Sequence, residues 1–574
     1  MAVDGSNKAL FRVCLIEAFE RNLANKMTLE IPSDLSGGLY FFDGKRQTIS
    51  TEKTFQVFEP HSGKVVADCP IATESDVDAV VKSAAKAQPA WGNTAPIERG
   101  KILNKVAEII RDNLEAIAQW EVRTNGKPIT EARIDIASSA DTFQFFAGIA
   151  PAVMKGDYFE LPGEALDRFA YTRREPLGVV GAIGAWNYPF QTCVWKVAPA
   201  LAAGNAVVYK PSPFAPASPV LLGEILAAAG LPVGVYNVIQ GEGETGSALC
   251  EHWLIRKVSF TGSVATGQKI QQQCARKNVK PVTLELGGKS PFIVFEDSEI
   301  ENAVAGAILA NFLNQGQVCT NGTRVFVQRS ILEEFTKVLL RETEKLRIGD
   351  PFKDETNVGA TINELQLNKV LGMVAKAKEE GAQVLRGGER VHPAGVEDGF
   401  YFDPTILTNL RDDMEIIQNE IFGGVLCILP FDTEEEVIER ANKTTYGLAA
   451  GLYSKQVSLI LLCIRRAHRV AAQLQAGTVY INTYNDTEVY IPFGGYKNSG
   501  HGRENCIETL HCYSQVKAVY VNTQNKLEHH LVVSFENQLI LLLGRHVSSN
   551  SLRKLDTTDD LLSQEVTDLK DNLS

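Results

Sequence analysis

The stretch Gly178-Val179-Val180-Gly181-Ala182-Ile183-Gly184-Ala185-Trp186-Asn187-Tyr188-Pro189 decides the fold of this chain. It begins with a short apolar run that is typical of a buried strand. Three more short apolar runs follow, and helical stretches lie between them. The apolar runs cover 205–209, 235–239 and 257–260, and the helical stretches cover 219–230 and 243–253. Strands that alternate with helices at this spacing predict βαβ units, a parallel sheet and an α/β fold.

The rest of the chain extends this pattern in both directions. A second alternating block begins at residue 282 and ends near residue 476, with helical periods over 301–314, 330–346 and 363–381. Before the first block, residues 50–72 are predicted to form strands. The 574 residues suffice for two or three domains.

Apolar residues that recur at steps of three and four predict a helix within 97–120, which Gly126 ends. Residues 1–26 have the pattern of a short amphipathic helix. Residues 523–574 lose the alternating pattern and become polar, which predicts a mobile tail.

Composition excludes several classes of function. The net charge is −12, with 44% hydrophobic and 22% charged residues, which is typical of a globular protein. An acidic balance argues against a nucleic-acid or membrane-surface binder, which would carry a basic stripe. No apolar run approaches the roughly 20 residues of a membrane span. Acidic residues at Asp4, Glu17 and Glu20 argue against a secretory signal or a mitochondrial transit peptide, so we expect a cytoplasmic protein.

Cysteine and histidine spacing predicts no metal site. None of the ten cysteines forms a CxxC pair, and the nine histidines show no HExxH pattern. The low cysteine density favours reduced thiols over a disulfide framework.

Cys319 lies among small and amide residues, in Asn314-Gln315-Gly316-Gln317-Val318-Cys319-Thr320-Asn321-Gly322. A free cysteine has a pKa of about 8.5, so little thiolate exists at neutral pH unless the site helps. A lone cysteine is more often a small buried hydrophobe than a nucleophile, and this segment alone leaves both interpretations open.

Glu285 follows an apolar run and precedes two glycines, in Val282-Thr283-Leu284-Glu285-Leu286-Gly287-Gly288-Lys289. Burial raises the pKa of a carboxyl group, so such a glutamate can act as a base near neutrality. A salt bridge to Lys289 or to another basic group is an equally good interpretation.

Asn187 follows the strand in the deciding stretch. A side-chain amide at a strand end can donate a hydrogen bond to an oxyanion. An asparagine in a turn before a proline is the simpler interpretation of this residue alone.

Two glycine-rich stretches are candidates for holding phosphates. The first, 241–246, is a literal GxGxxG after a strand, but its two glutamates suit a pyrophosphate poorly. The second, 260–267, precedes a helix that would begin near Ser263 and point free backbone N–H groups at an anion. Ser263 or Thr266 can equally serve only as a helix cap.

Seven motifs together are far more specific than any one of them. In chain order they are GAWNYP, KPSP (210–213), FTGS (260–263), LELGGKSP (284–291), GQVC (316–319), NEIFG (419–423) and PFGGYKNSGHGRE (492–504). Over roughly residues 50–522 the chain resembles the NAD(P)-dependent aldehyde dehydrogenase superfamily. Within it, YTRREPLGVVGAIGAWNYPFQ and GTRVFVQ are similar to the branch that oxidises aminoaldehydes, such as 4-trimethylaminobutyraldehyde in carnitine synthesis or betaine aldehyde.

This resemblance implies a role for each matching residue. Cys319 is the expected nucleophile, Glu285 the general base and Asn187 the oxyanion donor. The expected cofactor is NAD, held by Trp186, Lys210, Gly262, Ser263, Val264, Ala265, Thr266, Glu420 and Phe422. Tyr188 and Trp195 are the expected substrate contacts, since aromatic faces attract a quaternary ammonium group.

The implied fold has a Rossmann-like cofactor domain, an α/β catalytic domain and a β oligomerisation element, assembled as a homotetramer. The expected segments are a lead-in over 1–49, a cofactor domain over 50–149 and 171–288, and a catalytic domain over 289–490. The oligomerisation element and the loop region take 150–170 and 491–522, and the tail takes 523–574.

Three positions depart from the family pattern. Pro213 stands where NAD-selective relatives often have glutamate, so the choice between NAD and NADP stays open. Gly424 replaces a proline, and an apolar insertion covers 457–464. Three other functions remain as alternatives. The first is an aldehyde dehydrogenase that prefers betaine aldehyde or aliphatic aldehydes. The second is a thioester hydrolase or CoA-dependent acyl transferase that uses the same thiol, and the third is an inactive scaffold.

Overall fold

A computed structural model describes residues 29, 31, 38–49, 51, 53–162, 167–454 and 464–524. The predicted helix over 1–26, nearly all of the predicted tail and nearly all of the insertion over 457–464 lie outside these residues. The chain divides into two compact units, Met1–Gly156 with Arg173–Lys517, and Asp157–Thr172 with Ala518–Ser574. Within the described residues, no helix has both the length and the apolar character needed to cross a membrane.

The first unit contains two large sheets. The first has eight strands, in the order β2 (Lys45–Gln47), β1 (Tyr40–Phe42), β9 (Tyr236–Val238), β8 (Ala206–Lys210), β7 (Val179–Ile183), β10 (Ile255–Thr261), β11 (Val282–Glu285) and β21 (Gly500–His501). Its five strands from β9 to β11 are parallel, as the alternating pattern predicts.

The second sheet has seven strands, mostly parallel. Their order is β14 (Gln383–Arg386), β17 (Thr405–Thr408), β18 (Val425–Phe431), β13 (Arg324–Gln328), β12 (Pro291–Val294), β19 (Ala449–Tyr453) and β20 (Thr478–Ile481). Two antiparallel pairs are smaller: β3 (Thr54–Glu59) with β4 (Lys64–Pro70), and β15 (Arg390–Val391) with β16 (Tyr401–Phe402).

Helices cover both sides of the first sheet. One side packs against α2 (Glu74–Asn93), α8 (Gly243–Glu251) and α9 (Val264–Lys277). The other packs against α3 (Pro96–Asp112), α4 (Leu114–Asn125), α5 (Ile129–Val153), α6 (Pro189–Ala202) and α7 (Ser218–Ala229). Strand residues alternate between these two cores: Val207 and Tyr209 face the second group, whereas Ala206 and Val208 face the first.

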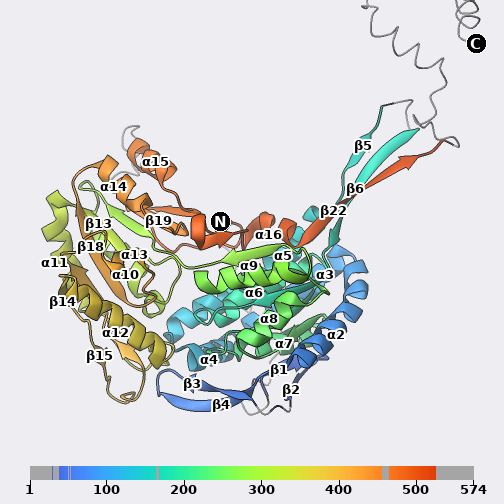
Figure 1. Cartoon of the computed structure of the whole chain (residues 1–574), viewed down its shortest axis with the longest axis horizontal. Helices are drawn as coiled ribbons and strands as arrows, with labels where there is room; N and C mark the ends of the chain where they lie inside the picture. The colour runs from blue at the N-terminus through green and yellow to red at the C-terminus, as the bar shows by residue number, and fades with distance from the viewer. Residues whose placement is uncertain are drawn as a thin grey trace, which may run out of the picture. The chain divides into compact units, whose positions relative to one another are not determined.

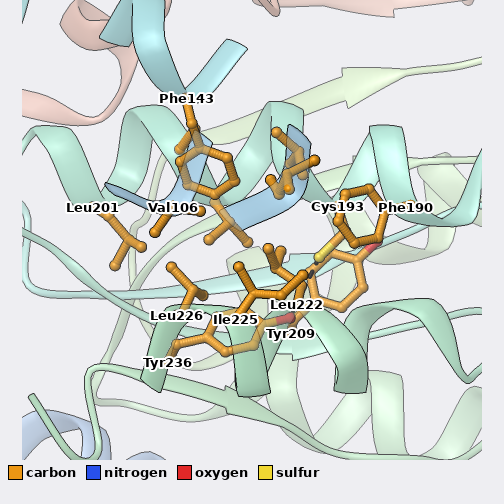
Figure 2. Packing of buried hydrophobic residues seen from close by; sticks show 14 of the residues in the cluster. Val106, Phe143, Phe190, Cys193, Leu201, Tyr209, Leu222, Ile225, Leu226 and Tyr236 are labelled. Atoms are coloured by element: carbon orange, nitrogen blue, oxygen red, sulfur yellow. Dashed lines mark hydrogen bonds between the residues drawn. The ribbon is translucent and has the colours of Figure 1, made fainter. Parts of the chain in front are cut away.

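The core under α7 is densely packed. Figure 2 shows the rings of Tyr209 and Tyr236, from β8 and β9, against Leu222 and Ile225 of α7. The Tyr236 hydroxyl donates to the Pro219 carbonyl at 2.8 Å and lies 3.4 Å from the Cys193 sulfur, so its polar end is satisfied inside an apolar core. All eight cysteines that the structure describes are free.

The second sheet also has helices on both sides (Figure 1). One side packs against α10 (Ile300–Phe312) and α11 (Leu332–Thr343). The other packs against α12 (Glu364–Glu379), α13 (Glu415–Gln418), α14 (Glu434–Asn442) and α15 (Ile464–Gln473). The remaining elements are η1 (Leu313–Gly316), η2 (Arg329–Ile331), η3 (Lys497–Ser499) and α16 (Cys506–Cys512).

The second unit contains strand β5 (Tyr158–Glu160) and parts of β6 (Arg168–Pro176) and β22 (Ser514–Asn522), which pair in the order β22-β6-β5. Tyr158, Phe159 and Tyr520 on these strands are exposed.

The prediction of one helix within 97–120 is wrong, because the structure has two helices, α3 and α4, that meet at Asn113. Asn113 ends α3, because its side-chain amide donates to the Ile109 carbonyl at 2.7 Å. Gly126 ends α4 as predicted, in a left-handed conformation with φ of 85°. The helix predicted over 219–230 likewise ends at Gly230, with φ of 97°.

These two caps allow a stability test. At Gly230 an added Cβ has open space, so Gly230→Ala carries only the backbone strain of a left-handed residue, about 1 kcal/mol. At Gly126 an added Cβ would lie 2.7 Å from the Ala360 carbonyl oxygen, so we expect Gly126→Ala to cost about 2–4 kcal/mol. Thermal unfolding of both variants measures the difference, and equal losses would contradict the close approach.

Candidate active site

The candidate site lies where the parallel strands of the first sheet end. Strand order reverses at β7, with β8 and β9 on one side of it and β10 and β11 on the other. Ligands of open α/β sheets bind beyond the carboxyl ends of strands at such a reversal. The predicted residues follow these ends: Trp186 and Asn187 after β7, Lys210 at the end of β8, Gly262 and Ser263 after β10, and Glu285 at the end of β11.

A cavity of about 830 Å³ is the space that these strand ends share with loops of the second sheet. Ten of the predicted residues line it: Trp186, Asn187, Lys210, Gly262, Ser263, Thr266, Glu285, Cys319, Glu420 and Phe422. Val264, Ala265, Tyr188 and Trp195 are not among its lining residues. Cys319 and Glu285 therefore line one cavity, although Glu285 ends a strand of the first sheet and Cys319 lies in the loop that precedes β13 of the second sheet.

A tight loop after α10 delivers Cys319. Asn314 and Gln315 both have left-handed backbones, with φ of 47° and 55°, which costs free energy in residues other than glycine. The loop is held from outside, because the Asn314 N–H donates to the Glu131 carboxylate at 2.8 Å and the Asn314 side-chain amide donates to the Asn187 carbonyl at 2.8 Å. These contacts fix the approach of the chain to Cys319.

Burial raises the pKa of the Cys319 thiol to about 12, and the charges of Glu420 and Glu285 add to the rise. Without a bound ligand, the thiol is therefore protonated at neutral pH. The half-buried side chain still reaches the cavity, so a reagent that enters the cavity can meet it.

Glu285 is buried, and neither of its carboxyl oxygens has a hydrogen-bond partner among the described residues. Lys289 does not pair with it, since the Lys289 ammonium also has no partner within the described part of the chain. Burial raises the pKa of Glu285 well above its usual value, and the Glu504 charge adds to this, whereas Lys196 and Arg503 oppose it. The salt-bridge interpretation of Glu285 is therefore wrong.

Strand β21 holds Glu285 in place from the far edge of the sheet. Gly500 pairs with Glu285 in antiparallel register, and the Leu286 N–H donates to the Ser499 carbonyl at 2.9 Å. On the other side, the Gly262 N–H donates to the Glu285 carbonyl at 3.0 Å. Two of the quoted motifs, PFGGYKNSGHGRE and FTGS, therefore meet at the backbone of Glu285.

Asn187 is buried, and its side-chain amide donates one hydrogen bond to the Gln317 carbonyl at 2.8 Å. An amide nitrogen carries two N–H groups, so the second remains for another acceptor in the cavity. Asn187 is not merely a turn residue, because it connects the end of β7 to the loop that carries Cys319.

The turn after β10 begins α9 at the predicted position. Ser263 caps α9, and its hydroxyl accepts the Thr266 N–H at 3.3 Å. The other free N–H groups of this first turn remain available to an anion. Lys210, at the end of β8, is buried and donates to the Pro211 carbonyl at 2.8 Å. Burial lowers the Lys210 pKa to about 8, and Glu242 partly opposes that shift.

Glu420 and Phe422 extend the lining from the second sheet. Glu420 accepts the Gly288 N–H at 2.9 Å and lies against Gly287, where a Cβ would come within 2.4 Å of its oxygen. The Phe422 ring lies edge-on to Trp186, with ring centroids 5.1 Å apart. A planar ring bound here would contact the aromatic rings of Phe422 and Trp186 beside the Glu420 carboxylate.

The two aromatic residues predicted to contact substrate are not among the lining residues of this cavity. The Lys127 ammonium sits 3.8 Å from the ring centroid of Tyr188, so one face of this ring already holds a cation. Trp195 packs against Phe493, with ring centroids 5.2 Å apart.

The predictions missed several lining residues, among them Glu242, Glu244, Lys269, Gln366 and Lys369. For Glu242 and Glu244, the GxGxxG pattern was the available signal. No local sequence motif identifies Gln366 and Lys369 as lining residues. They reach the cavity only because α12, which packs against the second sheet, carries them there.

A profile of the aldehyde dehydrogenase family matches residues 48–519. This chain belongs to the aldehyde dehydrogenase family. 4-Trimethylaminobutyraldehyde dehydrogenase of Homo sapiens is 53% identical over 470 residues, which is 82% of this chain and 93% of that protein. 4-Trimethylaminobutyraldehyde dehydrogenase A of Danio rerio is 51% identical over 486 residues, or 84% and 93%.

Solved structures of the family superimpose on most of the chain. Betaine aldehyde dehydrogenase of Staphylococcus aureus in complex with NAD+ gives a TM-score of 0.82 at 35% identity, covering 86% of this chain and 97% of that one. The aldehyde dehydrogenase fold and the enzyme class, as predicted from the motifs, are confirmed.

The thiol pKa predicts a pH dependence for alkylation of the ligand-free enzyme. Because the pKa of Cys319 is about 12, the thiolate fraction rises with pH throughout the accessible range. We expect the rate of Cys319 alkylation by iodoacetamide to rise about tenfold per pH unit between pH 7 and pH 9. Peptide mass spectrometry measures it, with Cys319→Ala as the blank, and a plateau below pH 9 would contradict the buried, charge-opposed thiol.

Proposed function

We propose that this protein oxidises cationic aminoaldehydes, of which 4-trimethylaminobutyraldehyde is the best candidate, to carboxylic acids with NAD. The observation that carries this proposal is the cavity that Cys319, Glu285 and Asn187 line together with the residues expected to hold the cofactor. Relatives about half identical over most of their length bear that substrate in their names, which supports the choice of aldehyde.

The lining residues fit a dinucleotide. The cavity volume of about 830 Å³ lies within the range for small-molecule sites. Lys210 would hold the adenosine ribose, and the first turn of α9 at Gly262 and Ser263 would hold the pyrophosphate, since its N–H groups favour an anion. Glu420 and Phe422 would hold the nicotinamide ribose and ring, with Trp186 and Thr266 completing the wall. Val264 and Ala265 would contribute only as part of the first turn of α9. NAD, when bound, accepts a hydride from the substrate carbon.

Cys319 begins the reaction by losing its thiol proton to water and adding its sulfur, as thiolate, to the aldehyde carbonyl carbon. The carbonyl oxygen gains a negative charge, which the second N–H of Asn187 and the backbone N–H of Cys319 stabilise. One such donor is worth about 3–4 kcal/mol of barrier in related sites. Loss of a hydride from the adduct leaves an acyl group bound to the sulfur as a thioester.

Glu285 completes the reaction by taking a proton from water. The water oxygen attacks the thioester carbon, the carbon–sulfur bond breaks, and the carboxylic acid leaves. The raised pKa of Glu285 makes it a stronger base than an exposed carboxylate, at the expense of its ionised fraction at neutral pH. The presence of a general base beside the thioester argues for water rather than CoA as the acyl acceptor.

Trp195 and Tyr188 would contact the substrate. Trp195 is the better place for a quaternary ammonium group, because Lys127 already occupies one face of Tyr188.

The proposal also includes the cellular location and the assembly of the enzyme. We place it in the cytoplasm as a homotetramer, with the domain boundaries and the oligomerisation element predicted from the sequence.

A matched pair of aldehydes tests the substrate. The purified enzyme receives 4-trimethylaminobutyraldehyde or its neutral isostere, in which carbon replaces the ammonium nitrogen, and NADH formation is followed by absorbance. We expect kcat/KM to be about tenfold higher for the cation, since desolvated cation–π contacts contribute roughly 1–2 kcal/mol.

Two variants serve as controls in this assay. Cys319→Ala should abolish NADH formation, whereas Cys512→Ala removes a half-exposed thiol that does not line the cavity and should leave turnover unchanged. Equal rates for the two aldehydes would overturn the substrate class, and turnover by Cys319→Ala would overturn the mechanism.

A further inference from the structure

The GxGxxG stretch over 241–246 received no role from the family resemblance, yet it lines the same cavity. Glu242, Gly243, Glu244 and Gly246 all belong to the lining. The stretch forms the loop after β9 and the first turn of α8, which begins at Gly243. A group that the catalytic chemistry does not use is therefore built into the wall of the active-site cavity.

This stretch lies at the end of the cavity where an adenosine would bind. The reactive ring of a dinucleotide must lie near Cys319 and Glu285, so its adenosine occupies the opposite end, beside β8. The position of Lys210 supports this placement. A Cβ added to Gly246 would lie 3.7 Å from the Lys210 side chain, and the charge of Glu242 acts on the Lys210 ammonium.

The glycines leave room for a ligand there. An added Cβ at Gly243 would meet no atom within 4 Å, so this part of the wall is bare backbone beside open space. A sugar or a base can pack closely against such a surface. The two glutamates flank Gly243 and border the same space.

The carboxylates of Glu242 and Glu244 are exposed, and neither accepts a hydrogen bond within the described part of the chain. Glu242 is the N-cap residue of α8, but its side chain makes no capping hydrogen bond. Glu244, in the first turn of α8, has no hydrogen bond or ion pair within the described part of the chain. Glu251, at the other end of the helix, pairs with Arg276 at 3.0 Å. The two cavity carboxylates thus keep their acceptor capacity for a ligand.

The cations near the adenosine end do not offset this charge. The Lys210 ammonium is engaged by the Pro211 carbonyl and faces Glu242. Lys269 lies in the second turn of α9, next to the first turn that suits the pyrophosphate, so we assign its charge to that group. Pro213 contributes neither a charge nor a donor. A ribose phosphate would therefore meet two carboxylates and one cation, the Lys210 ammonium, on which the Glu242 charge already acts.

We propose that Glu242 and Glu244 make this cavity selective for NAD over NADP. Their carboxylates accept hydrogen bonds from the adenosine ribose hydroxyls, and their charges repel a 2′-phosphate. This role compensates for Pro213, which stands where NAD-selective relatives often have a carboxylate. The inference rests on the proposed use of a nicotinamide dinucleotide, and it concerns binding rather than chemistry.

Isothermal titration calorimetry of NAD+ and NADP+ without aldehyde tests the inference in the full-length wild-type, Glu242→Gln, Glu244→Gln and double-variant proteins. Close like charges at a partly hydrated site change affinity about tenfold per charge. We expect wild type to bind NAD+ at least about tenfold more tightly than NADP+. Each single variant should tighten NADP+ binding about tenfold while changing NAD+ affinity by less than about threefold.

Glu251→Gln is the matched control, because it removes the same charge from the same helix outside the cavity. It should leave the affinity ratio unchanged. Equal affinities in wild type, or a ratio that neither single variant nor the double variant changes, would overturn the inference. Failure of the proposed function looks different: selective NAD+ binding would persist while no aldehyde is oxidised.

Discussion

The mutual placement of one thiol and one carboxyl group at one cavity is the constraint on which the rest of the structure depends. Glu285 ends a strand of the first sheet, and Cys319 follows a loop beside the second sheet. Burial makes each group hard to ionise, and the Glu285 charge further disfavours the Cys319 thiolate. In the ligand-free protein the thiol is therefore protonated at neutral pH, and burial raises the pKa of the carboxyl group above that of an exposed glutamate.

Two irregular features of the fold, a strained loop and an added edge strand, position these two groups. Backbone strain at Asn314 and Gln315 persists because Glu131 and Asn187 hold the loop from two directions. Strand β21 adds to the edge of the first sheet beside Glu285, although it comes from a segment more than two hundred residues later. The site is thus assembled from segments that are distant in the sequence. Each carries a recognisable motif, but no single motif identifies the site.

The sequence predicted the parallel sheet well because period and spacing report local geometry directly. Gly126 and Gly230 ended their helices as predicted, since only glycine adopts the left-handed cap at little cost. The break at Asn113 was missed because the apolar register continues across it. The motifs predicted ten residues that line the cavity, whereas Gln366 and Lys369 were missed because their approach depends on tertiary packing. Whether Glu285 had a partner was likewise a question that only coordinates could answer.

The most direct test of the central claim is peptide mass spectrometry of Glu285→Gln enzyme, quenched in acid within milliseconds of mixing with aldehyde and NAD+. The account predicts that an acyl group accumulates on the peptide that contains Cys319, approaching about one per chain, because water can no longer be activated to release it. Acylation of another residue, or consumption of aldehyde with an unmodified Cys319 at every time point, would contradict the account.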